Sequence, residues 1–83
     1  MNIAKQIDLA NKLVKEENYI YEMLVDYLAD RKIYHTIAIL IFSKVYNVDN
    51  NFSKDFIYSN EFYSNFKNEE NPFNDDFIGY KNG

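Results

Sequence analysis

The sequence predicts an all-α protein: a small helical bundle within a single domain. Apolar residues recur every three to four positions over residues 2–30 and 33–48, which is the period of an α-helix. Hydrophobic residues make up 47% and aromatic residues 18% of the 83 positions, which is enough to build a core. Cysteine is absent, so neither disulfides nor thiolate metal sites support so short a chain. Its stability must come from packed helices or from a partner chain.

Residues 2–30 are predicted to form a long amphipathic helix or a helix pair. Glu17 interrupts the apolar stripe once, so a kink or short turn at Glu17–Asn18 is the alternative to a continuous helix. Asn18 would then be the N-cap of the second helix. The stripe consists of Ile3, Ile7, Ala10, Val14, Tyr21, Leu24 or Val25, and Leu28.

A buried central helix is predicted over residues 31–47, with Asp30 as its N-cap. Apolar side chains cover most of its circumference, which is typical of a helix at the centre of a fold. A buried strand over residues 36–42 is the alternative, but the pattern outlasts the usual five or six residues of a strand. Replacing Leu40 or Ile41 with alanine should then cost about 2–5 kcal/mol. The two apolar faces are Ile33, Ile37, Leu40, Ile41, Val45 and Val48, and Tyr34, Ala38, Phe42 and Tyr46.

The remaining chain is predicted to contain an aromatic helix and an extended acidic tail. Residues 48–53 carry the strongest turn signal, and Ser53 could cap the helix that follows. Ser59–Asn60 could divide that helix in two. The predicted organisation is a helical domain over residues 1–67 and an acidic, aromatic tail over residues 68–83. The aromatic residues expected on the helix are Phe52, Phe56, Tyr63 or Phe62, and Phe66.

The chemistry of the chain argues against an enzyme and against a cofactor. There is no cysteine nucleophile, and the single histidine, His35, has no carboxylate at helical contact spacing to orient it. We therefore expect His35 to be a core-edge or surface residue. Both glycines lie near the C-terminus, so no glycine-rich phosphate loop is present. Adjacent carboxylates such as Glu69–Glu70 do not face each other on a helix.

One segment resembles the first half of a calcium-binding EF-hand loop, with oxygen-bearing side chains at Asp49, Asn51, Ser53 and Asp55. The position that requires glycine is Lys54, and the one that requires a bidentate glutamate is Asn60, five residues after Asp55. We expect no metal ion here, and interpret these residues as turn and cap chemistry.

Charge and hydropathy limit the partners. The formal net charge is −4, and all of it comes from residues 47–83, with seven acids and three bases. Phosphate contacts need clustered Lys and Arg, so direct nucleic-acid binding is disfavoured. The longest apolar run, residues 37–42, is far too short to span a membrane. The N-terminal residues do not resemble a signal peptide, so a cytoplasmic location is expected.

Acidic residues alternate with aromatic ones in the last third of the chain, and this combination predicts a protein-binding surface. Aromatic side chains supply rigid contact area, and acids steer a chain toward a basic partner. Phe56 and Phe66 are instead expected to pack in the core. The predicted partner-binding residues are Tyr58, Tyr63, Glu69, Glu70, Phe73, Asp75, Asp76, Phe77 and Tyr80.

The hypothesis from sequence is a non-enzymatic inhibitor or adaptor that binds a basic, nucleic-acid-handling host protein. Residue types with AT-rich codons supply more than half of the chain, which indicates a low-GC host, or a phage or mobile element within one. Anti-defence inhibitors, including anti-CRISPR proteins, share this acidic, aromatic profile. The alternatives are a dimeric DNA-binding regulator or antitoxin, and a structural homo-oligomer.

Overall fold

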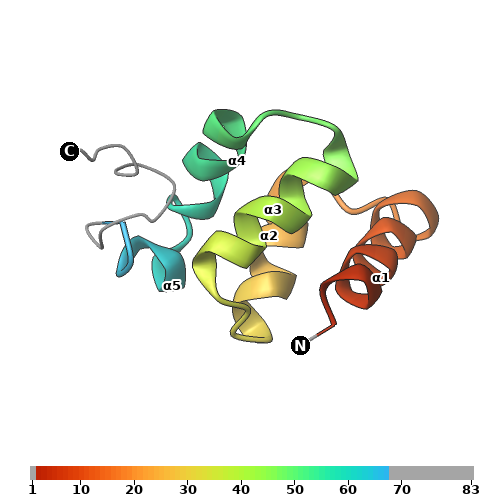
Figure 1. The fold of residues 1–83 in the computed structure, drawn as a ribbon, viewed down its shortest axis with the longest axis horizontal. Coiled ribbons are helices and arrows are strands. Elements are labelled where there is room, and N and C mark those ends of the chain that lie inside the picture. The colour runs from red at the N-terminus through yellow and green to blue at the C-terminus, as the bar shows by residue number, and fades with distance from the viewer. Residues whose placement is uncertain (1, 68–83) are drawn as a thin grey trace.

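The computed structural model describes residues 2–67, which form a bundle of five helices with no strand among them (Figure 1). The helices are α1 (Ile3–Glu16), α2 (Tyr21–Asp30), α3 (His35–Tyr46), α4 (Asn50–Ile57) and α5 (Glu61–Ser64). The predicted all-α class is confirmed, and residues 36–42 are helical, as predicted, and do not form the alternative strand. The predicted tail, residues 68–83, lies outside the described residues.

The N-terminal segment is a helix pair, as the alternative prediction had it. Asn18 has a φ of 58°, and the backbone N–H groups of Glu17 and Tyr19 both donate to the carbonyl of Leu13. A residue in this left-handed conformation commonly ends a helix, and Asn tolerates it well. Asn18 therefore terminates α1, and its prediction as the N-cap of α2 is wrong. Ile20 occupies that N-cap position without a side-chain hydrogen bond.

The second turn also differs from the prediction. Asp30 is the last residue of α2, so its prediction as the N-cap of the central helix is wrong. Backbone bonds continue past it: the N–H of Arg31 donates to the carbonyl of Tyr27 at 3.2 Å. Lys32, with a φ of 55°, then reverses the chain, and α3 begins four residues later than predicted. Its N-cap residue, Tyr34, makes no side-chain cap bond.

α3 is the central helix, with α2 behind it and α1 and α4 on its two sides (Figure 1). Its buried face is rotated from the predicted one. Thr36, which lies outside the two predicted apolar faces, is 9% exposed, whereas Leu40, expected in the core, is 36% exposed. α4 packs on α3 partly through polar side chains. There the hydroxyl of Ser43 lies 2.6 Å from that of Ser53, which is fully buried.

The aromatic cluster, made of Tyr21, Phe42, Tyr46, Phe52 and Phe56, joins α2, α3 and α4. Tyr21 lies at its centre, with ring-centroid distances of 4.6 to 5.5 Å to the other four rings. Most of these pairs are edge-to-face or tilted, which is the geometry that ring quadrupoles favour. The cluster is a single contact surface shared by three helices, so no two of them can separate without exposing the rings.

Side-chain caps set the start of the last two helices. Asp49 caps α4 by accepting a bond from the N–H of Phe52 at 2.8 Å. The prediction of Ser53 as that cap is therefore wrong: Ser53 lies inside α4 and donates its hydroxyl to the carbonyl of Asp49. The predicted division at Ser59–Asn60 is confirmed, because Asn60 is the N-cap of α5.

The burial pattern of α3 gives a matched pair of substitutions. Ile41→Ala should cost about 2–5 kcal/mol, since the side chain is fully buried and leaves a cavity. Leu40→Ala should cost about 1 kcal/mol, because the side chain already keeps a third of its surface in water. Urea unfolding measures both losses. Equal losses for the two variants would contradict the placement of Leu40.

Two tyrosines, one fully buried and one partly buried, make the fold sensitive to alkali. The hydroxyls of Tyr46 and Tyr63 donate to the carbonyls of Tyr19 at 3.0 Å and Ile33 at 2.6 Å. Burial, and secondarily the neighbouring Tyr21, raise the pKa of Tyr46 to about 12. Burial also raises the pKa of Tyr63. An unfolded tyrosine has a pKa of about 10, so the stability from both groups is complete below that pH and is lost as pH rises above it.

We therefore expect the free energy of unfolding to fall steeply between about pH 10 and 12. Tyr46→Phe should flatten this slope, because the phenol whose pKa differs between the two states is gone. Urea unfolding curves collected across that pH range test the effect. Tyr34→Phe, at a ring that is 52% exposed, is the control and should leave the slope as it is.

Candidate functional site

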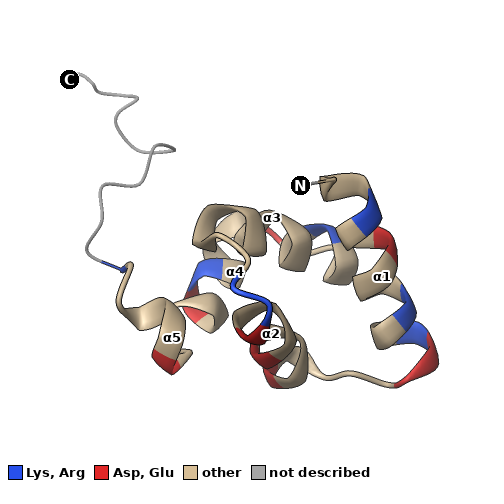
Figure 2. Ribbon diagram, turned by 90° about the horizontal axis from the view of Figure 1, so that it is seen from below, with Lys and Arg blue, Asp and Glu red and all other residues tan. Residues whose placement is uncertain are grey.

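An acid-rimmed groove runs between α2 and the connection from α4 to α5. Two adjoining hollows of about 460 Å³ each share Asp26, Asn60 and Glu61, and together we name them the acidic groove. In Figure 2, acidic residues mark both α2 and α5. The lining residues are Glu22, Val25, Asp26, Ala29, Asp30, Lys32, Phe56, Ser59, Asn60, Glu61, Phe62 and Asn65.

The rim of the groove is set by helical spacing. Glu22, Asp26 and Asp30 lie four residues apart, so they share one face of α2. All three are exposed, as is Glu61 on the opposite side, at the first position of α5. The one cation in the lining, Lys32, has its ammonium 5.2 Å from the ring centroid of Phe62. The rim therefore presents four carboxylates to a molecule approaching the groove.

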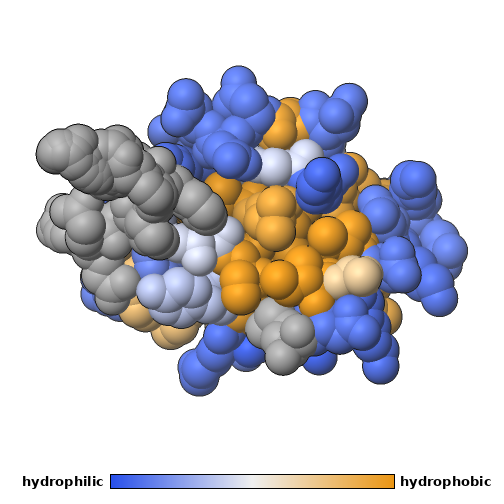
Figure 3. Space-filling view, viewed as in Figure 1, coloured by the Kyte–Doolittle hydropathy of each residue, from blue (hydrophilic) through white to orange (hydrophobic). Residues whose placement is uncertain are grey.

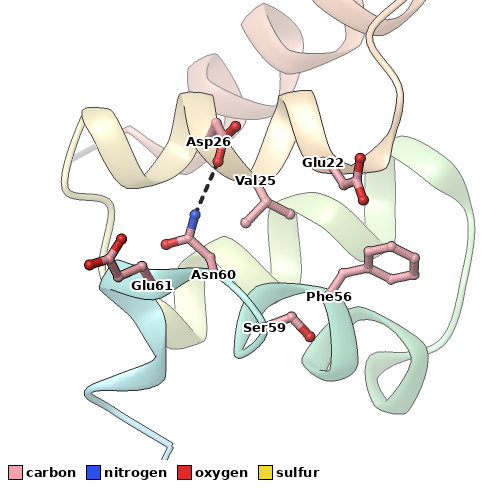
Figure 4. A pocket seen from close by; sticks show the side chains of 7 residues that line it. All are labelled: Glu22, Val25, Asp26, Phe56, Ser59, Asn60 and Glu61. Atoms are coloured by element: carbon pink, nitrogen blue, oxygen red, sulfur yellow. Dashed lines mark hydrogen bonds between the residues drawn. The ribbon is translucent and has the colours of Figure 1, made fainter.

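Two apolar residues contribute to the floor of the groove. Val25 of α2 points toward the groove in Figure 4, and Phe56 of α4 lies on the other side. Val25 is 3% exposed, and Phe56 is partly buried and belongs to the aromatic cluster. An apolar floor below a charged rim can accept one apolar side chain while the rim contacts basic groups around it.

Asn60 holds the two sides of the groove together. Its Oδ1 accepts bonds from the N–H groups of Phe62 at 2.8 Å and Tyr63 at 3.2 Å, which starts α5. Its Nδ2 donates to Oδ1 of Asp26 at 3.1 Å, the bond dashed in Figure 4. One side chain thus uses both ends of its amide, and it ties α5 to α2 across the groove.

The EF-hand-like residues are engaged in folding. Asp49 caps α4, and the hydroxyl of Ser53 bonds within the core. Within residues 2–67, no three His, Asp or Glu side chains come together in a way that could hold a metal ion. In the same part of the chain, no helix combines the length and apolar character needed to cross a membrane.

His35 belongs to the core. It is 1% exposed, its Nδ1 lies 2.7 Å from the hydroxyl of Tyr58, and its ring stacks on Phe66 at 5.0 Å between centroids. This buried, aromatic setting is typical of a structural histidine. The stacking also holds the segment that follows α5 against the start of α3, and it leaves Phe66, expected to pack in the core, partly buried.

The structure separates the residues predicted to contact a partner. Tyr63 is fully buried with its hydroxyl on the carbonyl of Ile33, so it offers no surface to a partner, which corrects its predicted role. Tyr58 is partly buried and faces His35. The other predicted contacts lie outside the described residues: Glu69, Glu70, Phe73, Asp75, Asp76, Phe77 and Tyr80.

The groove residues themselves were missed from sequence. The spacing of Glu22, Asp26 and Asp30 was a readable signal, because acids four apart on a helix form a row. Their juxtaposition with Glu61, 31 residues after Asp30, depends on how α5 folds back onto α2. Comparison of the chain with family models, with curated proteins and with solved structures finds no match.

Asn60 offers a test of the clamp across the groove. Asn60→Ala should cost about 1 kcal/mol, because both the cap of α5 and the bond to Asp26 are lost. Asn60→Asp keeps the cap but sets a carboxylate against Asp26, so it should recover only part of the loss. Urea unfolding gives both values, and Asn51→Ala on exposed α4 surface is the control. Full recovery by Asn60→Asp would show that the bond to Asp26 contributes nothing.

Proposed function

We propose that this protein is a non-enzymatic binding module whose acidic groove takes a basic segment of a partner protein. The observation that carries the proposal is the combination of four exposed carboxylates on the rim with the apolar residues Val25 and Phe56 on the floor. Rim charges speed the encounter with a basic surface, and an apolar anchor on the floor slows release. Neither feature requires a catalytic group.

The partner that best fits this chemistry is a protein that handles nucleic acid. Such a protein carries clustered Lys and Arg for phosphate contacts, and an acidic protein that covers them acts as an inhibitor or adaptor. Glu69, Glu70, Asp75 and Asp76 add charge of the same sign. The codon preference of the chain supports an origin in a phage or mobile element of a low-GC host, with an anti-defence role in the cytoplasm.

A DNA-binding regulator is less well supported. Its recognition helix must present a polar face to a groove of the duplex. The central helix α3 is buried on most of its circumference. The exposed residues of α4 include Asn50, Asn51 and Asp55, and its single basic residue, Lys54, is partly buried.

Removing the carboxylate charges of the groove tests whether these charges, and not the net charge of the whole chain, attract the partner. The variant Glu22→Gln, Asp26→Asn, Glu61→Gln should lose capture of basic proteins from a low-GC bacterial lysate, or show slower association with the purified partner and a weaker salt dependence. Surface plasmon resonance at several salt concentrations measures the rates.

The matched control is Asp8→Asn, Glu16→Gln, Glu17→Gln, which removes the same charge from exposed positions on or beside α1. It should bind as the parent does, and melting curves should show both variants folded. If the control loses binding to the same degree, net charge acts without the groove. If neither loses binding, the groove is not the site.

A further inference from the structure

A shallow, mostly apolar hollow lies on the outer side of α3, where the start of α4 borders it. We name it the α3 face: Thr36, Ile37, Ile39, Leu40 and Asn50, which line a shallow hollow of about 210 Å³. Leu40 keeps 36% of its surface exposed there. In Figure 3 a hydrophobic patch faces the viewer over α3, with hydrophilic residues around much of it.

We propose that residues 68–83 of the same chain dock on the α3 face, with Phe73 and Phe77 as the apolar contacts. This inference stands apart from the proposed function, since the acidic groove lies on other helices. In this arrangement the aromatic side chains beyond Lys67 pack on the α3 face in the free protein, and the neighbouring acids stay in contact with water.

The chain beyond Lys67 starts at the right end of α3. Phe66 stacks on His35, the first residue of α3, so the last described residues lie beside the N-terminal end of this helix. Leu40 lies five residues further along, about 7.5 Å at a rise of 1.5 Å per residue. Phe73 follows Lys67 by six residues and can reach up to about 20 Å. The connection is therefore long enough without strain.

The size and charge of the α3 face fit this segment. An apolar cavity of about 150 Å³ holds one benzene ring, so a hollow of 210 Å³ has room for one phenyl side chain. Lys44 is exposed one helical turn beyond Leu40. Asp75 and Asp76 stand between the two phenylalanines, where they would approach this ammonium.

A segment of the same chain has an advantage over a second copy. The segment is covalently attached to the helical domain, so its effective concentration at the α3 face is in the millimolar range for a short connection. A second copy must also lose translational and rotational freedom on binding. At the protein concentrations of ordinary experiments, which lie below this effective concentration, the tethered segment should therefore occupy the hollow in preference to a second copy.

The absence of cysteine allows a clean test on the full chain. A nitroxide label on Asn74→Cys, between the two phenylalanines, should broaden the NMR amide signals of Ile37, Leu40 and Lys44. The signal of Met23, on exposed α2 surface, should stay sharp. Adding Phe73→Ser and Phe77→Ser should restore the α3 signals. A melting curve of this variant checks that its helices remain folded.

Two further measurements decide the occupant. Leu40→Asp should abolish the broadening, whereas the control Met23→Asp, at a side chain 41% exposed, should not. A mixture of nitroxide-labelled chain with isotope-labelled, nitroxide-free chain should show no broadening. Broadening in the mixture would assign the α3 face to a second copy and overturn the proposal. Sharp α3 signals in the labelled chain itself would overturn it as well.

Discussion

The burial of α3 is the constraint on which the rest of this structure depends. Its first eight residues include six that are buried, and burying them requires a neighbour on nearly every side. α1, α2 and α4 supply those neighbours, while Tyr63 closes the end near Ile33 with a hydrogen bond. A chain of this length buries a modest share of its surface, so losing any one neighbour exposes a large fraction of the core.

Aromatic rings and hydroxyl groups make this packing specific. The aromatic cluster fixes α2, α3 and α4 through ring edges and faces, which have preferred orientations that aliphatic side chains lack. The hydroxyls of Tyr46 and Tyr63 satisfy carbonyls in the two chain reversals, at Tyr19 and Ile33. The bond to Ile33 is buried, and leaving that acceptor unpaired would cost about 1–3 kcal/mol.

The same packing produces the candidate site. α5 has only four helical residues, too few to be stable alone, and it is held by the cap at Asn60 and by buried Tyr63. Because Tyr63 points into the core, Glu61 is left on the surface opposite Asp26. The groove is thus a consequence of anchoring a short helix: the residues that secure α5 also set its carboxylate across from the acidic row of α2.

The sequence by itself determined the helical class, the buried central helix and the division near Ser59–Asn60, because these follow from apolar periodicity and local capping. It also contained the acidic row of α2. Only the tertiary structure decided the rest. Asn18 and Lys32 adopt left-handed conformations because the reversals require them, and Leu40 keeps a third of its surface in water in the shallow hollow that it lines with Asn50 of α4. The pairing of Asp26 with Asn60 joins residues 34 positions apart, a distance over which periodicity carries no information.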